Sequence, residues 1–427
     1  MGTETLTGDL KSQWLKMNLE VSIISSFVFT GMFSSGEFDS VRERLEKKHP
    51  GNTIGFDAYV FLESDTKYLL EELHGSWDGR KSAIQFLASV DNESGLKATE
   101  LAKKLLSKTR KKPVALTTFL PEISQCLEDG KDKTVLNAVR NLFSIAVAIG
   151  ASDGKPPIVQ MVAGNMLDDV RIQPESNVQE NIAKSEAKAS TPKKKKRNSF
   201  YVVSSDELAA YERILGRIAT CLNELRESLG SNQQEAFNNL RIAFELEPGP
   251  LYLLDGPASI VRFCQLIENH EDPLIKKHVG FNLDVAHWWL KEIEPRFLEE
   301  PFQYLKDTAT NIDPMIFDNP EPNLKSRIFH SHISGHSRRA HFGDISISLM
   351  SEEDKVKYVY WLAALSKLQR DSGFSGYVSL EFEAARSRDC VIDSASELIQ
   401  LIAKAEHPLP PNPYSKKKPR LRKTNVE

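Results

Sequence analysis

The sequence predicts a single-domain (β/α)₈ barrel, an α/β fold. The main observation is a rhythm of short apolar runs of strand type that alternate with longer amphipathic segments of helix type. About eight such strands can be counted, and the spacing between them leaves room for parallel crossovers. An open doubly wound sheet is the alternative, but no Gly-rich fingerprint follows the first strand. The predicted strands cover residues 19–29, 53–62, 113–119, 157–163, 240–247, 279–287, 327–333 and 377–383.

The predicted helices lie between these strands. Periodic apolar residues or alternating charges mark the clearest of them. The segments 66–73 and 81–90 are apolar without a clear period, and helix is the favoured interpretation. The other predicted helices cover residues 38–48, 96–108, 135–149, 205–229, 260–268, 355–369 and 394–404.

Composition narrows the class of protein. With 427 residues and 40% hydrophobic residues, the chain is long for one domain but ordinary for a barrel with insertions. A net charge of -4 gives no general sign of a nucleic-acid or membrane partner, and no run of 18 apolar residues predicts a membrane span. The polar N-terminus does not resemble a signal peptide, and the four cysteines are scattered, which predicts reduced thiols and a cytoplasmic location.

Three segments are expected to stand apart from the barrel, which is assigned to residues 19–407. Residues 1–18 are an N-terminal extension, and residues 408–427 are a Pro-rich basic tail. Residues 167–199 are polar and lack periodicity, which predicts a disordered insertion. The run from Lys193 to Arg197 and the tail are typical of nuclear import or polyanion binding, so a nuclear location and a nucleic-acid contact stay open. Two solvated basic segments are the simpler interpretation.

Four late strands each end in a side chain that could bind a metal. Because neighbouring strand ends of a barrel converge on one mouth, these side chains are expected to lie together. Two Glu, one Asp and one His form a mostly oxygen site for one Mn²⁺, Mg²⁺ or Co²⁺ ion, and such a site tolerates Zn²⁺. The alternative explanation for any one of these carboxylates is a helix cap or a surface charge, and for Asp284 with His287 it is an ion pair in the core. The four residues are Glu247, Asp284, His332 and Glu381.

Five segments, in this order, resemble the xylose isomerase-like TIM barrels. That superfamily contains sugar and sugar-phosphate isomerases and epimerases, and also the endonuclease IV type of abasic-site nuclease. The resemblance covers about residues 235–405, and before that only the strand–helix rhythm agrees. The segments are Phe244-Glu-Leu-Glu-Pro-Gly, Leu283-Asp-Val-Ala-His287, Phe329-His-Ser-His-Ile-Ser-Gly335, Ala340-His-Phe-Gly343 and Gly376-Tyr-Val-Ser-Leu-Glu381.

The resemblance to the epimerase branch implies a mechanism. The four strand-end residues would be ligands of one divalent metal, which stabilises an enediolate. Glu247 and Glu381 would remove and return a proton beside the substrate carbonyl. His287 would contact that carbonyl, and the segment that holds Arg338 and His341 would bind substrate oxygens. The expected partner is a small sugar or sugar phosphate.

Two alternatives remain. The nuclease branch needs three metals and extra histidines on the second and third strands, which this sequence lacks, and Arg339 occupies its Asp position. The second alternative is a barrel that has lost catalysis and serves as a binding scaffold. Nucleic acid is not favoured as a partner, no membrane contact is expected, and a homo-oligomer is left open.

Overall fold

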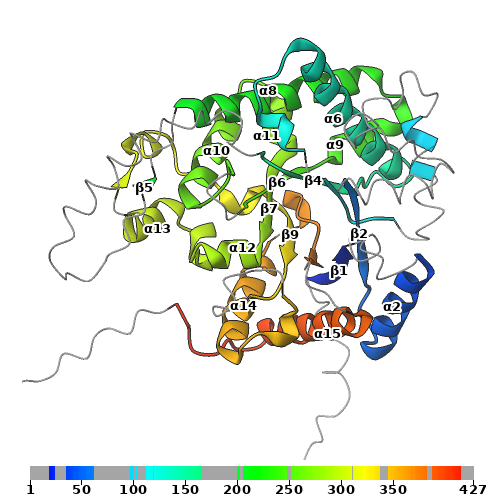
Figure 1. Cartoon of the computed structure of the whole chain (residues 1–427), viewed down its shortest axis with the longest axis vertical. Coiled ribbons are helices and arrows are strands. Elements are labelled where there is room, and N and C mark those ends of the chain that lie inside the picture. Colours follow the sequence, from blue (N-terminus) through cyan, green and yellow to red (C-terminus); the bar gives the residue numbers. More distant parts are fainter. Residues whose placement is uncertain are drawn as a thin grey trace, which may run out of the picture.

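Eight parallel strands form a closed barrel in the computed structural model (Figure 1). Every neighbouring pair in the ring is parallel, and the order around it is β1-β10-β9-β7-β6-β4-β3-β2. The strands are β1 (Glu20–Ile24), β2 (Gly55–Phe61), β3 (Ala115–Thr118), β4 (Ile158–Val162), β6 (Ile242–Glu245), β7 (Val279–Asp284), β9 (Ile328–Ile333) and β10 (Tyr377–Leu380). All eight predicted strands are therefore present, most of them shorter than predicted.

The structure describes residues 19–24, 35–61, 97–100, 102–103, 112–118, 120–164, 200–201, 205–247, 252–309, 311–336, 345–368, 370–381 and 387–414. The predicted helices at 66–73 and 81–90 and the predicted insertion at 167–199 lie outside these residues. So do the N-terminal extension, the basic run that ends at Arg197 and the end of the C-terminal tail.

Helices surround the ring of strands (Figure 1). The longer ones are α2 (Ser35–Lys48), α6 (Asp129–Gly150), α8 (Ser205–Ser228), α10 (Pro257–Asn269), α14 (Glu352–Leu365) and α15 (Arg388–Ala405). The shorter ones are α9 (Gln234–Asn239), α11 (Pro273–His278), α12 (Val285–Leu290) and α13 (Pro301–Thr308). Two short strands, β5 (Phe200–Tyr201) and β8 (Asn311–Ile312), pair outside the barrel. No helix in the described part of the chain has both the length and the apolar character of a membrane span.

The last two helices begin earlier than the sequence pattern predicted. Ser351 caps α14, where its Oγ accepts the backbone N–H of Asp354 at 3.2 Å. Ser387 caps α15 in the same way, where its Oγ accepts the N–H of Cys390 at 3.3 Å. A serine at the N-cap satisfies an otherwise unpaired amide, so each helix starts at its serine rather than at its first apolar residue.

The two faces of the barrel strands differ in polarity. In β1, Val21 and Ile23 belong to the large apolar core shared with the helices, whereas Ser22 reaches Asp57 of β2 inside the barrel. The inner positions of the later strands are polar as well, and they are almost fully buried. Burying so many polar groups costs free energy unless the groups are paired. The polar interior is therefore a candidate functional site. These buried side chains are Gln160, Glu245, Asn282, Asp284, His330, His332 and Ser379.

An apolar floor closes the amino-terminal end of the barrel below this polar layer. Ala115, Ile158, Ala243 and Phe329 form a small cluster separate from the main core. Phe329 takes its place through an irregularity in β9, because the pairing passes from Phe281↔Ile328 directly to Asn282↔His330. The bulge thus places the Phe329 side chain in the apolar floor, while His330 and His332 both face the interior.

His278, the last residue of α11, provides a test of how the lower barrel responds to acid. Its buried ring lies with Nδ1 at 2.8 Å from the carbonyl oxygen of Leu240, which Nδ1–H donates to. Burial lowers the pKa of His278 from 6.5 to about 4, and Arg241 and Lys277 add to this. The unfolded chain therefore binds a proton at a higher pH than the folded chain does.

We expect His278→Asn to reduce the acid sensitivity of the fold. The contribution of His278 to stability is fully present above about pH 6.5 and is lost as the pH falls toward 4, up to roughly 3 kcal/mol. Asn removes the titrating group and keeps a donor for Leu240. Denaturant unfolding at pH 7 and pH 4.5 measures the difference, with the exposed His407→Asn as the matched control. An equal loss of stability in wild type and His278→Asn would contradict this assignment.

Candidate metal centre

Four side chains that can bind a metal meet at the carboxyl ends of four strands that are consecutive in the barrel. Glu245 ends β6, Asp284 ends β7, His332 is the fifth residue of β9, and Glu381 directly follows β10. Each offers one ligand atom, and these atoms all lie within 4.8 Å of one another. We call these four residues the ligand group.

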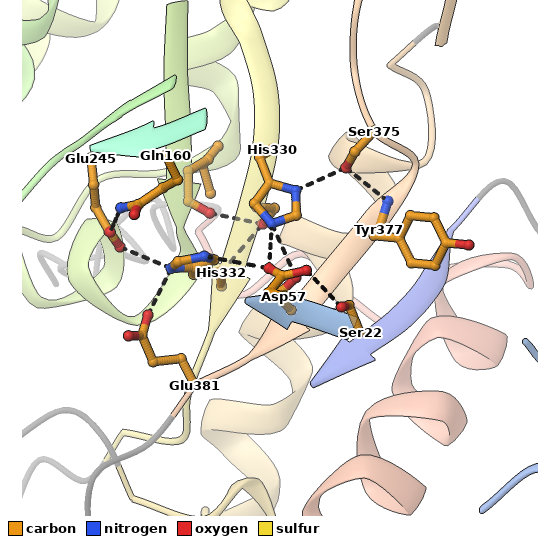
Figure 2. A network of polar contacts seen from close by, with 12 residues as sticks. Ser22, Asp57, Gln160, Glu245, His330, His332, Ser375, Tyr377 and Glu381 are labelled. Carbon is orange, nitrogen blue, oxygen red and sulfur yellow. Dashed lines mark hydrogen bonds and ion pairs between the residues drawn. The ribbon is translucent and has the colours of Figure 1, made fainter. Parts of the chain in front are cut away.

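His332 lies at the centre of the ligand group (Figure 2). Its Nδ1 is 2.6 Å from Glu381 Oε2 and 3.4 Å from Glu245 Oε1. The other oxygen of Glu245 accepts a hydrogen bond from Gln160 Nε2. Asp284 accepts the backbone N–H of His287 with Oδ1 at 2.9 Å, which makes it the N-cap of α12 as well. The predicted strand at 279–287 therefore ends at Asp284, because the cap starts a helix there.

The ligand group fits a divalent cation. Two of its carboxylate oxygens, Glu245 Oε1 and Asp284 Oδ2, are buried and make no hydrogen bond to any residue that the structure describes. Buried carboxylate charge without hydrogen bonds is costly in a protein interior, and a bound cation would compensate it. Three carboxylates and one imidazole form the mostly oxygen donor set that suits Mg²⁺, Mn²⁺ or Co²⁺ and that Zn²⁺ tolerates.

The charges of the ligand group are strongly coupled. Burial acts to lower the pKa of His332, but the carboxylates of Glu381 and Glu245 raise it well above its usual value. Burial acts to raise the pKa of Glu381, and His332 nevertheless keeps that pKa below its usual value. Burial raises the pKa of Glu245, and Glu381 raises it further while His332 opposes the change. The site thus concentrates negative charge around one imidazole.

Glu247 and His287 lie beside the ligand group. His287 Nδ1 is 3.9 Å from Glu247 Oε2 and 3.8 Å from Glu245 Oε1, and it also lies 3.0 Å from the carbonyl oxygen of Leu246. Both side chains are partly open, at 22% exposure for Glu247 and 12% for His287. Burial is the main reason that the pKa of Glu247 is raised to about 8. The neighbouring carboxylates also raise this pKa, and His287 lowers it.

The sequence-based expectation and the structure disagree about which of two glutamates belongs to the ligand group. The expected member was Glu247, and the observed member is Glu245. The reason is that β6 ends at Glu245, and the backbone N–H of Glu247 donates to Leu254 at 2.9 Å instead of to a neighbouring barrel strand. The chain has therefore left the ring before it reaches Glu247.

The other expected site residues divide into two sets. Asp284, His332 and Glu381 come together as expected, and His287 lies next to them. Arg338 and His341 lie outside the described residues. The sequence reasoning passed over Glu245, Gln160 and Asp57, which face the same interior (Figure 2). Asp57 carried a usable signal, since it is a single charge inside an otherwise apolar strand.

Comparison with solved structures supports the fold. No protein-family model matches the sequence, and a search of curated proteins found none that matches it. Among solved structures, the chain is similar to a xylose isomerase-like TIM barrel protein from Mycobacterium smegmatis, whose crystal structure is a complex with magnesium. The similarity has a TM-score of 0.43 at 10% sequence identity, and it covers 91% of this chain and 98% of that one. By the closure, order and direction of its eight strands, this chain is a (β/α)₈ TIM barrel.

Proposed function

We propose that this protein is a metal-dependent isomerase or epimerase of a sugar or sugar phosphate. The observation that supports the proposal is the ligand group at the carboxyl ends of four barrel strands, with a second Glu–His pair, Glu247 and His287, beside it. In TIM barrels this end of the strands carries the catalytic residues. A metal site flanked by a carboxylate and an imidazole is suited to proton transfer beside a carbonyl group.

Glu245, Asp284, His332 and Glu381 would hold one divalent ion. When bound, that ion would supply positive charge for a substrate carbonyl oxygen and would stabilise the negative charge that develops there. Glu381 is 23% exposed and Glu247 is 22% exposed, so both carboxylates are open to the mouth. Their strands, β10 and β6, are separated in the ring by β9 and β7.

We assign the acid–base work to these two glutamates. One removes a proton from the carbon next to the carbonyl, and the other delivers a proton, so that the configuration or the carbonyl position changes. His287 would hold the substrate carbonyl. The segment of Arg338 and His341 would contact the hydroxyl or phosphate oxygens of the substrate, because an arginine can bind such oxygens with two parallel hydrogen bonds.

A phosphodiesterase of the endonuclease IV type is the second candidate. The observation in its favour is a further group, Asp57, His330 and His332, whose ligand atoms also lie within 4.8 Å of one another. That nuclease type uses several metals. Both oxygens of Asp57, however, already accept hydrogen bonds from Ser22 and His330, at 2.7 Å and 2.8 Å, so the protein itself satisfies the carboxylate of this second group.

We expect purified protein to bind one divalent ion per chain. The reason is that the four ligand atoms enclose a single site, while the second group has internal partners. Elemental analysis after dialysis against a metal-free buffer provides the measurement. About three ions per chain would favour the phosphodiesterase. No ion, even after loading with Mn²⁺ or Zn²⁺, would favour a binding scaffold.

Solvent-deuterium exchange on a panel of ketoses and ketose phosphates tests the chemistry itself. Metal-loaded wild type is expected to exchange the proton next to the carbonyl of at least one member. If the protein holds its metal and exchanges no proton on any of them, the isomerase proposal fails for these substrates. Nicking of abasic DNA by the same preparation would then place the phosphodiesterase first.

A further inference from the structure

The imidazole of His332 lies between two sets of carboxylates. On one side, Nδ1 faces Glu381 and Glu245 of the ligand group. On the other side, Nε2 lies 3.8 Å from Asp57 Oδ2 (Figure 2). The ring is fully buried, so solvent does not compete for either nitrogen. In the neutral imidazole, which is the form that binds a metal, one nitrogen carries the proton and the other is the ligand.

Asp57 is itself held in place from two directions. Ser22 donates to Oδ1 at 2.7 Å, and His330 Nε2 lies 2.8 Å from Oδ2. His330 is fixed in turn by Ser375 Oγ, 2.9 Å from Nδ1, and Ser379 Oγ also lies 3.0 Å from Nε2. Asp57 and His330 have no exposed surface. The result is a rigid buried carboxylate that is supported by residues from β1, β9 and β10 and by the turn before β10.

Asp57 does not need a metal to be satisfied, yet it lies where a metal-binding histidine needs an acceptor. Both of its oxygens already have partners, which argues against a second ion there. Metal-ligating histidines usually donate their second ring N–H to a carboxylate or carbonyl group, which fixes the tautomer and the ring orientation. At 3.8 Å the contact is longer than a hydrogen bond, and contacts of this kind often shorten when the site is filled.

We propose that Asp57, held by Ser22 and His330, is a positioning residue that keeps the proton of His332 on Nε2 and leaves Nδ1 free as the metal ligand. This inference rests on the proposed metal site and extends it to residues that bind no metal. Nδ1 is the nitrogen that lies within 4 Å of both Glu381 and Glu245, so the geometry points to the same nitrogen from both sides of the ring.

The test is the Asp57→Asn variant of the full-length protein. Asn keeps the shape of the side chain but lacks the charge that holds the Nε2 proton. We expect the Kd for Mn²⁺ to rise by about 10- to 100-fold, as is typical for loss of such a partner. We also expect the visible absorption bands of the Co²⁺-loaded protein to shift, because the orientation of an imidazole ligand changes. A purely structural role would not alter that spectrum.

Two further variants serve as controls. Thr117→Val changes another buried barrel residue, whose hydroxyl makes no hydrogen bond to a described residue, so it is expected to bind Mn²⁺ as wild type does. His330→Gln can still donate to Asp57 from its terminal amide, and we expect it to keep most of the Mn²⁺ affinity. If Asp57→Asn does not fold, Ser22→Ala removes only the hydrogen bond to Oδ1 and should raise the Kd by about 3-fold, as expected for one buried hydrogen bond.

The outcomes separate this inference from the proposed function. Wild-type Mn²⁺ affinity and an unchanged Co²⁺ spectrum in folded Asp57→Asn would overturn the role of Asp57 and leave the metal site intact. The same holds for unchanged affinity in Ser22→Ala if it is the variant that folds. Two ions per wild-type chain and one per Asp57→Asn chain would make Asp57 a ligand, which also overturns the inference. No metal in wild type would remove the proposed function, and the inference with it.

Discussion

Glu381→Gln is expected to keep the fold and most of the metal affinity while slowing proton exchange by about 10²- to 10⁴-fold, the usual contribution of a general base. The amide has nearly the same shape and still offers one oxygen next to His332, whose Nδ1 is 2.6 Å from Glu381 Oε2. Near neutral pH, however, an amide does not accept a proton as a carboxylate does. This variant should therefore still bind the metal but exchange the substrate proton slowly.

The measurement is the rate of deuterium uptake from D₂O into the substrate, at saturating Mn²⁺ for each variant. His287→Asn is the matched comparison, because His287 lies beside the ligand group without belonging to it. That variant should also keep its metal but slow turnover through weaker contact with the substrate. Exchange at the wild-type rate in metal-loaded Glu381→Gln would show that another group removes the proton.

The fold could be predicted because it depends on patterns that repeat along the chain. Each barrel strand carries apolar residues on its outer face, and this alternation is visible even where the inner face is polar, as at Val21, Ser22 and Ile23. The ends of elements were less predictable. Single hydrogen bonds decide them, such as the caps made by Ser351 and Ser387. The sequence pattern did not predict the bulge at Phe329, because the bulge depends on how Phe329 packs with residues of other strands in the barrel floor.

The site could be predicted only in part, for a related reason. Asp284, His332 and Glu381 are polar residues at strand ends, and the strand pattern alone identifies them. The choice between Glu245 and Glu247 needs the position where the chain leaves the ring, since residues two apart in a strand share a face. Asp57 stands out as a single charge in an apolar strand, but its role could not be predicted, because its partner His330 lies 273 residues away in the sequence. Pairing over that distance is set by barrel closure, not by local pattern.

The structure also indicates how the barrel can carry so much buried polarity. The polar layer rests on the apolar floor of Ala115, Ile158, Ala243 and Phe329. Below the ligand group, Asp57 is satisfied internally by Ser22 and His330. Among the carboxylates of the barrel strands, Glu245 and Asp284 each keep one buried oxygen that makes no hydrogen bond to a described residue, and both lie at strand ends. Internal hydrogen bonds thus satisfy the carboxylate of Asp57, whereas the two strand-end carboxylates keep oxygens that can bind a cation.

Glu245→Gln and Glu247→Gln make the same chemical change two residues apart, and we expect opposite results. Glu245 Oε1 lies within the ligand group and has no hydrogen-bond partner among the described residues. In Glu245→Gln the hydrogen bond from Gln160 holds the amide oxygen, so the NH₂ group, which binds no metal, faces the ligand group. Mn²⁺ binding should therefore weaken by more than the roughly 10- to 100-fold that is typical for loss of an outer partner of a ligand. The amide oxygen can still accept the hydrogen bond from Gln160, so the fold should be preserved.

Glu247→Gln should instead leave Mn²⁺ binding within about 3-fold of wild type, because a charge outside the ligand group contributes mainly a screened, longer-range attraction. Deuterium exchange should fall, since Glu247 is the proposed partner of Glu381 in proton transfer. Equilibrium dialysis with Mn²⁺ and exchange at saturating metal measure the two effects separately. If Glu247→Gln loses its metal and Glu245→Gln keeps it, Glu247 is the ligand, as the strand spacing in the sequence suggested. In that case the side chain of Glu247 must move from beside His287 into the ligand group when the metal binds.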